Sequence, residues 1–434
     1  MAFKPARVLK SGVQRTLFSL EQFSRHEMAN HAAAGAYSFL LSALPALLVI
    51  LYISTLLART FGMDAQSAYG ALGSFLDAFG GKELIGPLLE RPIASVAGAF
   101  GIINLIWAAR VFVLSIQRGV RVVYAGSASV NPVRENVLTF AVELVVLVAA
   151  IILIAGAQIA RAILSAIDWP FMRELAGRLV GLGLRVIPMA ALWLFVFLTY
   201  LNVPPKRPRR GNAFVTSLLC VAIYLGLSAV LGAILDTSRY GILYGLLGNL
   251  IAGLIKVYSF FWFYFFFAEF CYTLENYDSL LFARFHRLDT ADKAPNALER
   301  RLFSAPQRLF RKYAREYAPG EPVFAKGDQG DEAYYLYKGS VSVYLEDPET
   351  GCAPVTRVRE GEFFGEMAGF LKEGRSAWTR AEGEATIFRL PAAMFKQILT
   401  QDPAASMRLV GIMAERLAAN NQLISGDGSA GSGP

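Results

Sequence analysis

A glycine, a glutamate and an arginine form the clearest candidate for a ligand site in this sequence. Gly365 and Glu366 open a short helical stretch, and Arg375 follows after a short gap. Backbone N–H groups at a helix start can hold an anion, and the guanidinium of Arg375 adds a permanent positive charge for the same anion. A carboxylate beside an anion site is useful when the ligand also carries a hydroxyl group that donates to it. These residues therefore predict a sugar phosphate, and hence a nucleotide, as the ligand.

This segment resembles the phosphate-binding cassette of the cyclic nucleotide-binding domain family, and residues 375–378 are similar to its catabolite-activator branch. Glycine-punctuated runs at 317–321 and 327–331 and the run 335–343 extend the resemblance over about residues 305–424. The resemblance implies that Glu366 accepts the ribose 2′-hydroxyl and that Arg375 holds the cyclic phosphate. The residues expected to form this cyclic nucleotide site are Gly365, Glu366, Met367, Ala368, Arg375, Ser376, Ala377 and Val355.

The closing helix expected over 394–422 bears on the base and on oligomerisation. In the catabolite-activator branch small hydroxyl residues of this helix meet the adenine, and the matching positions here are Asn420 and Asn421. Asparagine can pair with adenine or guanine, so cAMP is preferred over cGMP but both stay open. Apolar residues at three-and-four spacing in this helix either pair with a second copy, giving a homodimer, or close over the nucleotide.

Composition indicates a membrane protein. Hydrophobic residues make up 55% of the chain and charged residues 18%, and the apolar excess lies before residue 275. Apolar spans are expected at about 32–58, 93–117, 137–160, 179–201, 213–235 and 244–271. The net charge of +8 lies largely in basic clusters beside these spans, where membrane topology explains it better than nucleic acid. The positive-inside pattern places both termini in the cytoplasm.

The spans carry a second resemblance. The stretches 31–45, 107–112, 200–204, 240–245 and 262–269 are similar, in order, to landmarks of the YihY/BrkB family of inner-membrane proteins. The resemblance implies a multi-pass protein of the bacterial inner membrane but assigns no settled activity. No catalytic residues are expected, because the sequence shows no nucleophile and base arrangement. No metal site is expected either, because the three cysteines and three histidines do not cluster.

Ionisable residues inside apolar spans are costly unless they are paired or hydrated. Arg110, Glu143 and Lys256 are predicted to line a polar pathway through the bundle. The alternative is structural ion pairing between helices, or snorkelling to the membrane interface by Arg110, Arg185 and Glu269.

The chain is thus predicted to combine a six-span α-helical transmembrane bundle with a β-roll cyclic nucleotide-binding domain and flanking helices. The expected divisions are a basic cytoplasmic segment (1–31), the membrane domain (32–274), a helical connector (275–312), the nucleotide domain (313–424) and a flexible tail (425–434). The expected function is regulation of a transporter- or channel-like bundle by cAMP or, second, cGMP. The alternative is a membrane-tethered receptor that recruits protein partners without transport. Nucleic acid is not an expected partner, because no helix-turn-helix follows the last helix.

Overall fold

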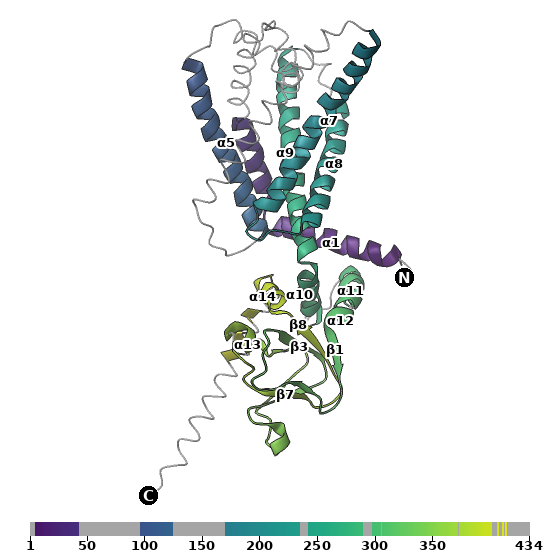
Figure 1. The fold of residues 1–434 in the computed structure, drawn as a ribbon, viewed down its shortest axis with the longest axis vertical. Helices are drawn as coiled ribbons and strands as arrows, with labels where there is room; N and C mark the ends of the chain where they lie inside the picture. The colour runs from purple at the N-terminus through teal and green to yellow at the C-terminus, as the bar shows by residue number, and fades with distance from the viewer. Residues whose placement is uncertain are drawn as a thin grey trace. The chain divides into compact units, whose positions relative to one another are not determined.

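The computed structural model describes residues 5–42, 96–124, 170–234, 242–289, 297–304, 306–371, 373–401, 406–407, 410–411 and 413–414. It divides the chain into two compact units. A membrane unit comprises residues 15–275, and a nucleotide unit comprises residues 276–434 together with residues 1–14. Each unit is described by itself below (Figure 1).

The described part of the membrane unit is mainly helical. Its helices are α1 (Pro5–Arg25, whose first residues belong to the nucleotide unit), α5 (Val96–Val123), α7 (Pro170–Asn202), α8 (Arg210–Ile234) and α9 (Ile242–Glu275), with a further helical stretch at 28–42. Within the described residues, three segments are long and apolar enough to cross a membrane: Glu174–Asn202, Arg210–Ile234 and Ile251–Glu275. They coincide with the last three predicted spans. The predicted second span lies in α5, the first is only partly described and the third lies outside the described residues, so the count of six stays a prediction.

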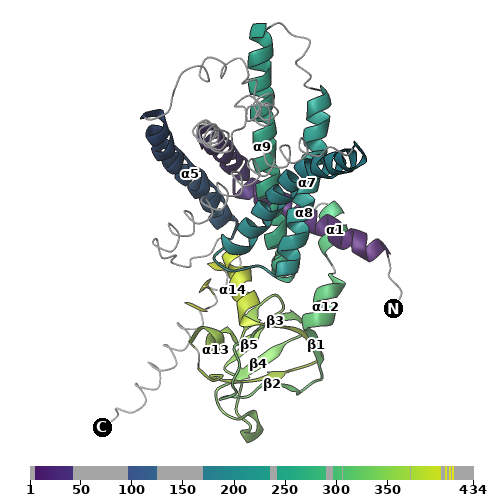
Figure 2. The same cartoon turned by 45° about the horizontal axis from the view of Figure 1, so that its top comes forward.

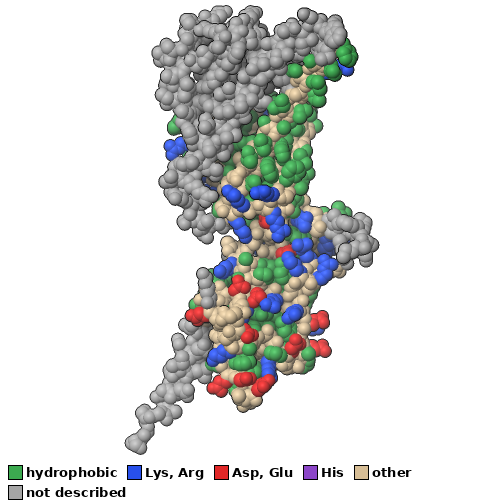
Figure 3. Space-filling view, in the orientation of Figure 1, with side chains coloured by type: hydrophobic (Ala, Val, Ile, Leu, Met, Phe, Trp, Pro, Cys, Tyr) green, Lys and Arg blue, Asp and Glu red, His purple; other side chains and the backbone are tan. Residues whose placement is uncertain are grey.

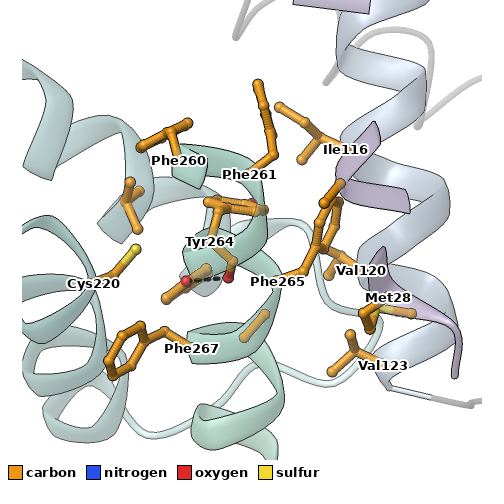
Figure 4. Close-up of a cluster of buried hydrophobic side chains, with 14 of the residues drawn as sticks. Met28, Ile116, Val120, Val123, Cys220, Phe260, Phe261, Tyr264, Phe265 and Phe267 are labelled. Carbon is orange, nitrogen blue, oxygen red and sulfur yellow. Dashed lines mark hydrogen bonds between the residues drawn. The ribbon is translucent and has the colours of Figure 1, made fainter. Parts of the chain in front are cut away.

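Aromatic side chains of α9 form the core of the membrane unit. Phe261, Tyr264 and Phe265 are each almost fully buried, and Figure 4 shows Phe265 beside Val120 of α5. Their bulk is accommodated by small residues, since a Cβ atom added at Gly119 of α5 would lie 2.3 Å from the ring of Phe265. The Tyr264 carbonyl also accepts a hydrogen bond from the Tyr200 hydroxyl at 2.6 Å. The outer faces of α7 and α8 are instead hydrophobic over a broad area, as a lipid-facing surface requires (Figure 3).

The nucleotide unit contains two four-stranded antiparallel sheets that form a roll (Figure 2). One sheet has the order β1-β8-β3-β6 and the other the order β2-β7-β4-β5. The strands are β1 (Ala314–Tyr317), β2 (Pro322–Phe324), β3 (Ala333–Lys338), β4 (Val341–Tyr344), β5 (Thr356–Val358), β6 (Phe363–Phe364), β7 (Trp378–Ala381) and β8 (Ala385–Leu390). Inward-facing residues of both sheets, including Leu336, Val341 and Ile387, share one buried core. The β-roll expected from the sequence is therefore present.

Helices surround this roll. They are α10 (Tyr277–Asp289), α11 (Ala297–Phe303), α12 (Gln307–Tyr313), α13 (Glu366–Leu371) and α14 (Ala392–Gln401). The first three fall within the predicted connector, and contact places them in the same unit as the roll. Gln14 of α1 joins this unit too, because it accepts a hydrogen bond from the Tyr277 hydroxyl at 2.5 Å and donates one to the Leu302 carbonyl at 2.7 Å.

Helix α10 is fixed to the roll by aromatic packing. The ring centre of Phe282 lies 5.4 Å from that of Tyr335 and 5.6 Å from that of Phe388. The ring centre of Phe285 lies 5.8 Å from that of Phe388 and 5.9 Å from that of Phe310 of α12. Edge-to-face aromatic pairs of this kind add to the stabilisation that burial alone provides. Only Asn276 separates α10 from α9, so the helix that packs on the roll directly continues the last membrane helix.

A half-buried aspartate adds an ionic clamp between α10 and α12. Asp278 accepts hydrogen bonds from Arg308 Nε at 2.5 Å, from Lys312 Nζ at 2.6 Å and from the Tyr313 hydroxyl at 3.1 Å. Burial by itself raises the pKa of Asp278, but the hydrogen bonds from Arg308 and Lys312 outweigh burial and hold this pKa below its ordinary value. The ionised form of Asp278 therefore stabilises the folded unit.

We predict that Asp278→Asn lowers the stability of the nucleotide unit by about 1 kcal/mol at pH 7, a modest loss because Arg308 and Lys312 are half-exposed. The pKa of Asp278 is lower in the folded state than in the unfolded state. The carboxylate therefore stabilises the folded unit fully above its unfolded-state pKa of about 3.9, and this stabilisation is lost as the pH falls through the folded-state pKa. Thermal unfolding of the full chain should show a Tm difference that is constant from pH 7 to 5 and shrinks in more acidic buffer. Glu349→Gln, which removes a mostly exposed pair with Arg380, is the control. A difference between wild type and Asp278→Asn that does not depend on pH would contradict the clamp.

Candidate nucleotide-binding site

Gly365 connects strand β6 to helix α13 in a conformation that favours glycine. Its φ of 69° lies in the left-handed region that favours glycine. A Cβ atom there would lie 3.0 Å from Phe324, 3.0 Å from Tyr334 and 3.1 Å from Nη1 of Arg375. A side chain at this position would therefore be strained, and the turn places Glu366 at the first position of the helix.

Backbone hydrogen bonds hold Arg375 against the loop between β2 and β3. The Gly327 N–H donates to the Arg375 carbonyl at 2.8 Å, and the Arg375 N–H donates to the Asp328 carbonyl at 3.0 Å. Gly374 allows this close approach, because a Cβ atom there would lie 3.1 Å from the Gly327 carbonyl oxygen. The position of Arg375, in the segment before β7, is thus set by the loop between β2 and β3, which is distant in the sequence.

The guanidinium of Arg375 points into the roll and is only 4% exposed. It donates through Nη1 to the carbonyl oxygens of Gly365 and, at 3.0 Å, Glu332. It also lies 4.6 Å from the ring centre of Phe324 and 5.2 Å from that of Tyr334. A buried positive charge needs such partners, since a charge removed from water without them is strongly unfavourable.

Glu332 supplies a carboxylate that contacts this guanidinium. Its Oε2 lies 3.5 Å from Nη2 of Arg375, and its Oε1 accepts from Nη2 of Arg389 at 2.5 Å. Burial raises the pKa of Glu332, but the hydrogen bond from Arg389 and the positive charges of both arginines outweigh burial, so the pKa lies below its ordinary value. Glu332 is therefore ionised at neutral pH and shares its charge between Arg375 and Arg389.

A pocket of about 230 Å³ opens beside Arg375. Its walls come from the first three strands of the roll, the loop between β2 and β3, the segment before β7, and β8. They are formed by Arg315, Tyr317, Val323, Phe324, Asp328, Gln329, Glu332, Tyr334, Arg375 and Arg389. Three arginines in one concave site make it suitable for an anionic ligand such as a phosphate.

The structure brings some of the predicted site residues together. Arg375 contacts the carbonyl of Gly365, and the next residue, Glu366, is 2% exposed; Ala368 is buried as well. Met367, at 40% exposure, and Ser376 face the surface, and Ala377 is half-buried.

Arg375 is the one predicted site residue among the described residues that line this pocket, and the lining does not include Gly365, Glu366, Met367, Ala368, Ser376 or Ala377. The remaining parts of the prediction are Val355 and two asparagines. Val355 is exposed and lines a second pocket of about 840 Å³ with residues that include Arg357 and Glu382, none of which borders Arg375. Asn420 and Asn421 lie outside the described residues.

Sequence reasoning missed Phe324, Tyr334, Glu332 and Arg389, although all four border the pocket. They come from three strands or strand edges, and no local motif links them to Arg375. Strand pairing brings two of them together, since β3 pairs with β8 and places Tyr334 opposite Arg389.

The ionisable residues of the membrane unit are placed as follows. Arg110 is exposed on α5, Lys256 is half-buried on α9, and Glu143 lies outside the described residues, so the polar pathway stays a prediction. Glu269 is fully buried, and its Oε1 lies 2.6 Å from Nδ1 of His26. The alternative of snorkelling is therefore wrong for Glu269, because a buried and paired carboxylate does not reach the interface.

The fold and the site together define a membrane protein that carries a cyclic nucleotide-binding domain. The cyclic nucleotide-binding domain family matches residues 314–402. The family described as Virulence factor BrkB matches residues 19–286, which is more than half of the sequence. The chain belongs to this BrkB/YihY family, and both resemblances drawn from the sequence are confirmed.

Curated relatives match the nucleotide domain. The cAMP-activated global transcriptional regulator Vfr of Pseudomonas aeruginosa is 32% identical over 109 residues, which are 24% of this chain and 51% of Vfr. The regulator CRP of Salmonella typhimurium is 30% identical over 114 residues, which are 26% of this chain and 54% of CRP. The chain thus spans about half the length of the curated relatives it matches. Because these relatives are transcriptional regulators, the comparisons do not support the expectation that nucleic acid is excluded as a partner.

Solved structures also match this domain. The catabolite activator protein of Thermus thermophilus is 21% identical, with 33% of this chain and 62% of that chain covered and a TM-score of 0.25.

We predict that Gly365→Ala destabilises the nucleotide unit by about 1–3 kcal/mol, because alanine at a left-handed φ is strained and its Cβ meets two rings and a guanidinium. Gly383→Ala is the matched control, since a Cβ atom there has no neighbour within 4 Å. Denaturant unfolding of the full chain, followed by tryptophan fluorescence, measures both variants. Equal stabilities of the two variants would contradict the described geometry of Gly365.

Proposed function

We propose that the chain is a cyclic-nucleotide-responsive protein of the bacterial inner membrane. In this proposal a cyclic nucleotide, cAMP in preference to cGMP, binds the cytoplasmic roll and regulates a transporter- or channel-like membrane bundle. The observation that carries the proposal is the buried guanidinium of Arg375, which lies against the carbonyl of Gly365 at the start of the helix that begins with Glu366. The relatives' names, which describe cAMP-activated regulators, support cAMP as the first ligand to test.

Binding requires Arg375 to exchange partners. Its guanidinium contacts two carbonyl oxygens and the carboxylate of Glu332, and in this proposal a phosphate that enters replaces the contact with Glu332. Glu332 is the partner most easily given up, because its distance of 3.5 Å makes it the longest of these contacts and because Arg389 retains it. A phosphate also brings the charge that Glu332 supplies, so the exchange leaves no buried charge unpaired. In the same proposal Glu366, at the start of α13, accepts the ribose hydroxyl.

The proposed route from ligand to membrane begins at Phe363, in the strand that immediately precedes Gly365. Its ring lies 5.2 Å from His286 of α10, 5.0 Å from Tyr335 and 5.2 Å from Phe395 of α14. Any shift of β6 and α13 on binding therefore presses on α10. Since α10 continues α9 after Asn276, a shift of α10 changes the strain on the last membrane helix. A tenfold preference of the nucleotide for one state would bias the equilibrium by about 1.4 kcal/mol.

The proposed cytoplasmic location follows from the end of α9. Glu275, its last residue, accepts hydrogen bonds from the backbone N–H of Arg209 at 2.8 Å and from Asn212 Nδ2 at 2.6 Å. The end of α9 therefore lies on the same side of the bundle as the connection between α7 and α8. That connection is basic, with Lys206, Arg207, Arg209 and Arg210 exposed. Basic short connections face the cytoplasm, which supports a cytoplasmic position for the domain that follows α9.

We predict that Arg375→Ala weakens cAMP binding by about 2–3 kcal/mol, or roughly 30- to 150-fold, because the phosphate loses its main charge-assisted hydrogen bonds. Arg375→Lys should lose less, because it keeps the charge without the planar fork. Arg359→Ala, which removes an exposed arginine of the same domain, is the matched control. Titration calorimetry with cAMP and with cGMP on the full chain in nanodiscs gives both affinities, and thermal unfolding verifies that the variants are folded. If a folded Arg375→Ala variant bound cAMP as tightly as wild type, the site assignment would be wrong.

A second prediction tests the coupling. In proteoliposomes, cAMP should change ion flux through the wild-type protein, measured with a potential-sensitive dye. Phe282→Leu should keep the dissociation constant within about threefold and reduce the response by about half or more, since it loosens the packing of α10 at a cost below about 1.5 kcal/mol. Tyr344→Leu, on the opposite sheet, should leave the response intact. If cAMP binds and flux does not respond, the protein is instead a tethered receptor that recruits partners without transport.

A further inference from the structure

The end of α1 places a histidine against a fully buried carboxyl group. Helix α1 ends at Arg25, and Glu27 takes a left-handed conformation with a φ of 51°, which is unusual for a residue with a side chain. Helical structure resumes at Met28. Figure 4 shows Met28 beside Val123 of α5, so the chain at this break is packed into the bundle. The break directs His26 toward α9, where Nδ1 lies 2.6 Å from Oε1 of Glu269.

The two partners differ in their access to water. The side chain of Glu269 is 0% exposed, while that of His26 is 19% exposed. Among the residues that the structure describes, Oε2 of Glu269 has no hydrogen-bond partner. An ionised carboxylate with a single donor is poorly stabilised in a bundle core, and protonation relieves that cost. Any proton that reaches Glu269 by the described contacts passes through the imidazole.

We propose that His26 and Glu269 form a proton-binding site in the membrane unit, with the imidazole carrying the proton between solvent and the buried carboxyl group. The site begins as a neutral imidazole that donates from Nδ1 to the carboxylate. A proton from water binds Nε2, and the Nδ1 proton passes to Oε1. The products are a neutral imidazole protonated at Nε2 and a neutral carboxylic acid, so the pair has gained one proton.

Other titratable groups surround the pair in the described part of the unit. Tyr124, at the end of α5, interacts electrostatically with Glu269 and with Cys271 and Glu275 of α9. On the segment that follows α1, His31 interacts with Glu27 and with His26, while Glu27 is exposed and accepts a hydrogen bond from Asn30 at 3.0 Å. The interactions of Tyr124 and His31 with the pair are electrostatic, whereas His26 lies within hydrogen-bond distance of Glu269, so the direct coupling is between Glu269 and His26.

The pair also holds two elements together. His26 belongs to the break after α1, and Glu269 lies near the end of α9. Phe23, one turn before His26, packs with its ring 4.8 Å from Trp262 of α9. Proton uptake changes a charge-assisted contact into a neutral one at this junction, and thereby changes how firmly α1 is attached to α9.

The test is a pH titration of the full chain in nanodiscs by infrared difference spectroscopy. We expect a carboxyl C=O band that appears on acidification and is absent in Glu269→Gln. Its titration midpoint should shift by about 1 pH unit or more in His26→Gln, because removing a direct hydrogen-bond partner changes the balance between the two protonation states. His31→Gln is the matched control and should leave the midpoint within about 0.3 pH units. A midpoint that is the same in His26→Gln as in wild type would overturn the proposal.

A second readout remains informative if Glu269→Gln fails to assemble. The chain has only three histidines, His26, His31 and His286, so each ¹⁵N imidazole signal can be assigned by its loss in a single variant. In Glu269→Asp, which withdraws the carboxyl group from His26 without removing it, the His26 titration should move by about 0.5 pH units or more while that of His31 stays in place. Equal shifts of both histidines, or no shift of either, would show that His26 is not coupled to Glu269.

Discussion

The buried guanidinium of Arg375 is the interaction on which the nucleotide domain depends. Arginine stays charged at every physiological pH, so its burial is possible only where the fold provides permanent partners. The domain supplies carbonyl oxygens from Gly365 and Glu332, and a carboxylate from Glu332. The rings of Phe324 and Tyr334 cover it. These groups come from β2, β3 and the turn after β6, so the same charge that attracts a phosphate also fixes the relative positions of the elements around the pocket.

The aromatic cluster of α10 gives this arrangement a mechanical consequence. Phe282 and Phe285 pack on the sheet that contains β3, β6 and β8, and Phe363 of β6 joins the same cluster. Packed cores respond to small shifts by changing between discrete arrangements and not by gradual deformation. An exchange of partners at Arg375 would be felt at Gly365, then at Phe363, and then at α10.

Some of this organisation could be predicted from the sequence, because it is encoded locally. Gly365, Glu366 and Arg375 lie close together in the sequence and form a recognisable motif. The last three spans are likewise recognisable from their hydropathy. Glu332, Phe324 and Tyr334 could not be found this way, because strand register brings them to Arg375 from distant positions. The same holds for His26 and Glu269, whose contact joins residues far apart in the chain. Hydropathy shows that Glu269 lies in an apolar span, but it cannot show whether the side chain points to lipid, to the interface or to a partner.

The two buried ionic centres differ in how they can change state. Arg375 cannot lose its charge, so it responds only by exchanging one anionic or carbonyl partner for another, which makes it a receiver for a ligand that carries negative charge. Glu269 and His26 can both be neutralised, so their contact responds to protons and needs no other ligand. Burial has opposite consequences in the two cases, because it favours an anionic partner for Arg375 and a neutral acid for Glu269. In the two proposals, the nature of each side chain, and not the fold alone, makes one centre responsive to a ligand and the other responsive to a proton.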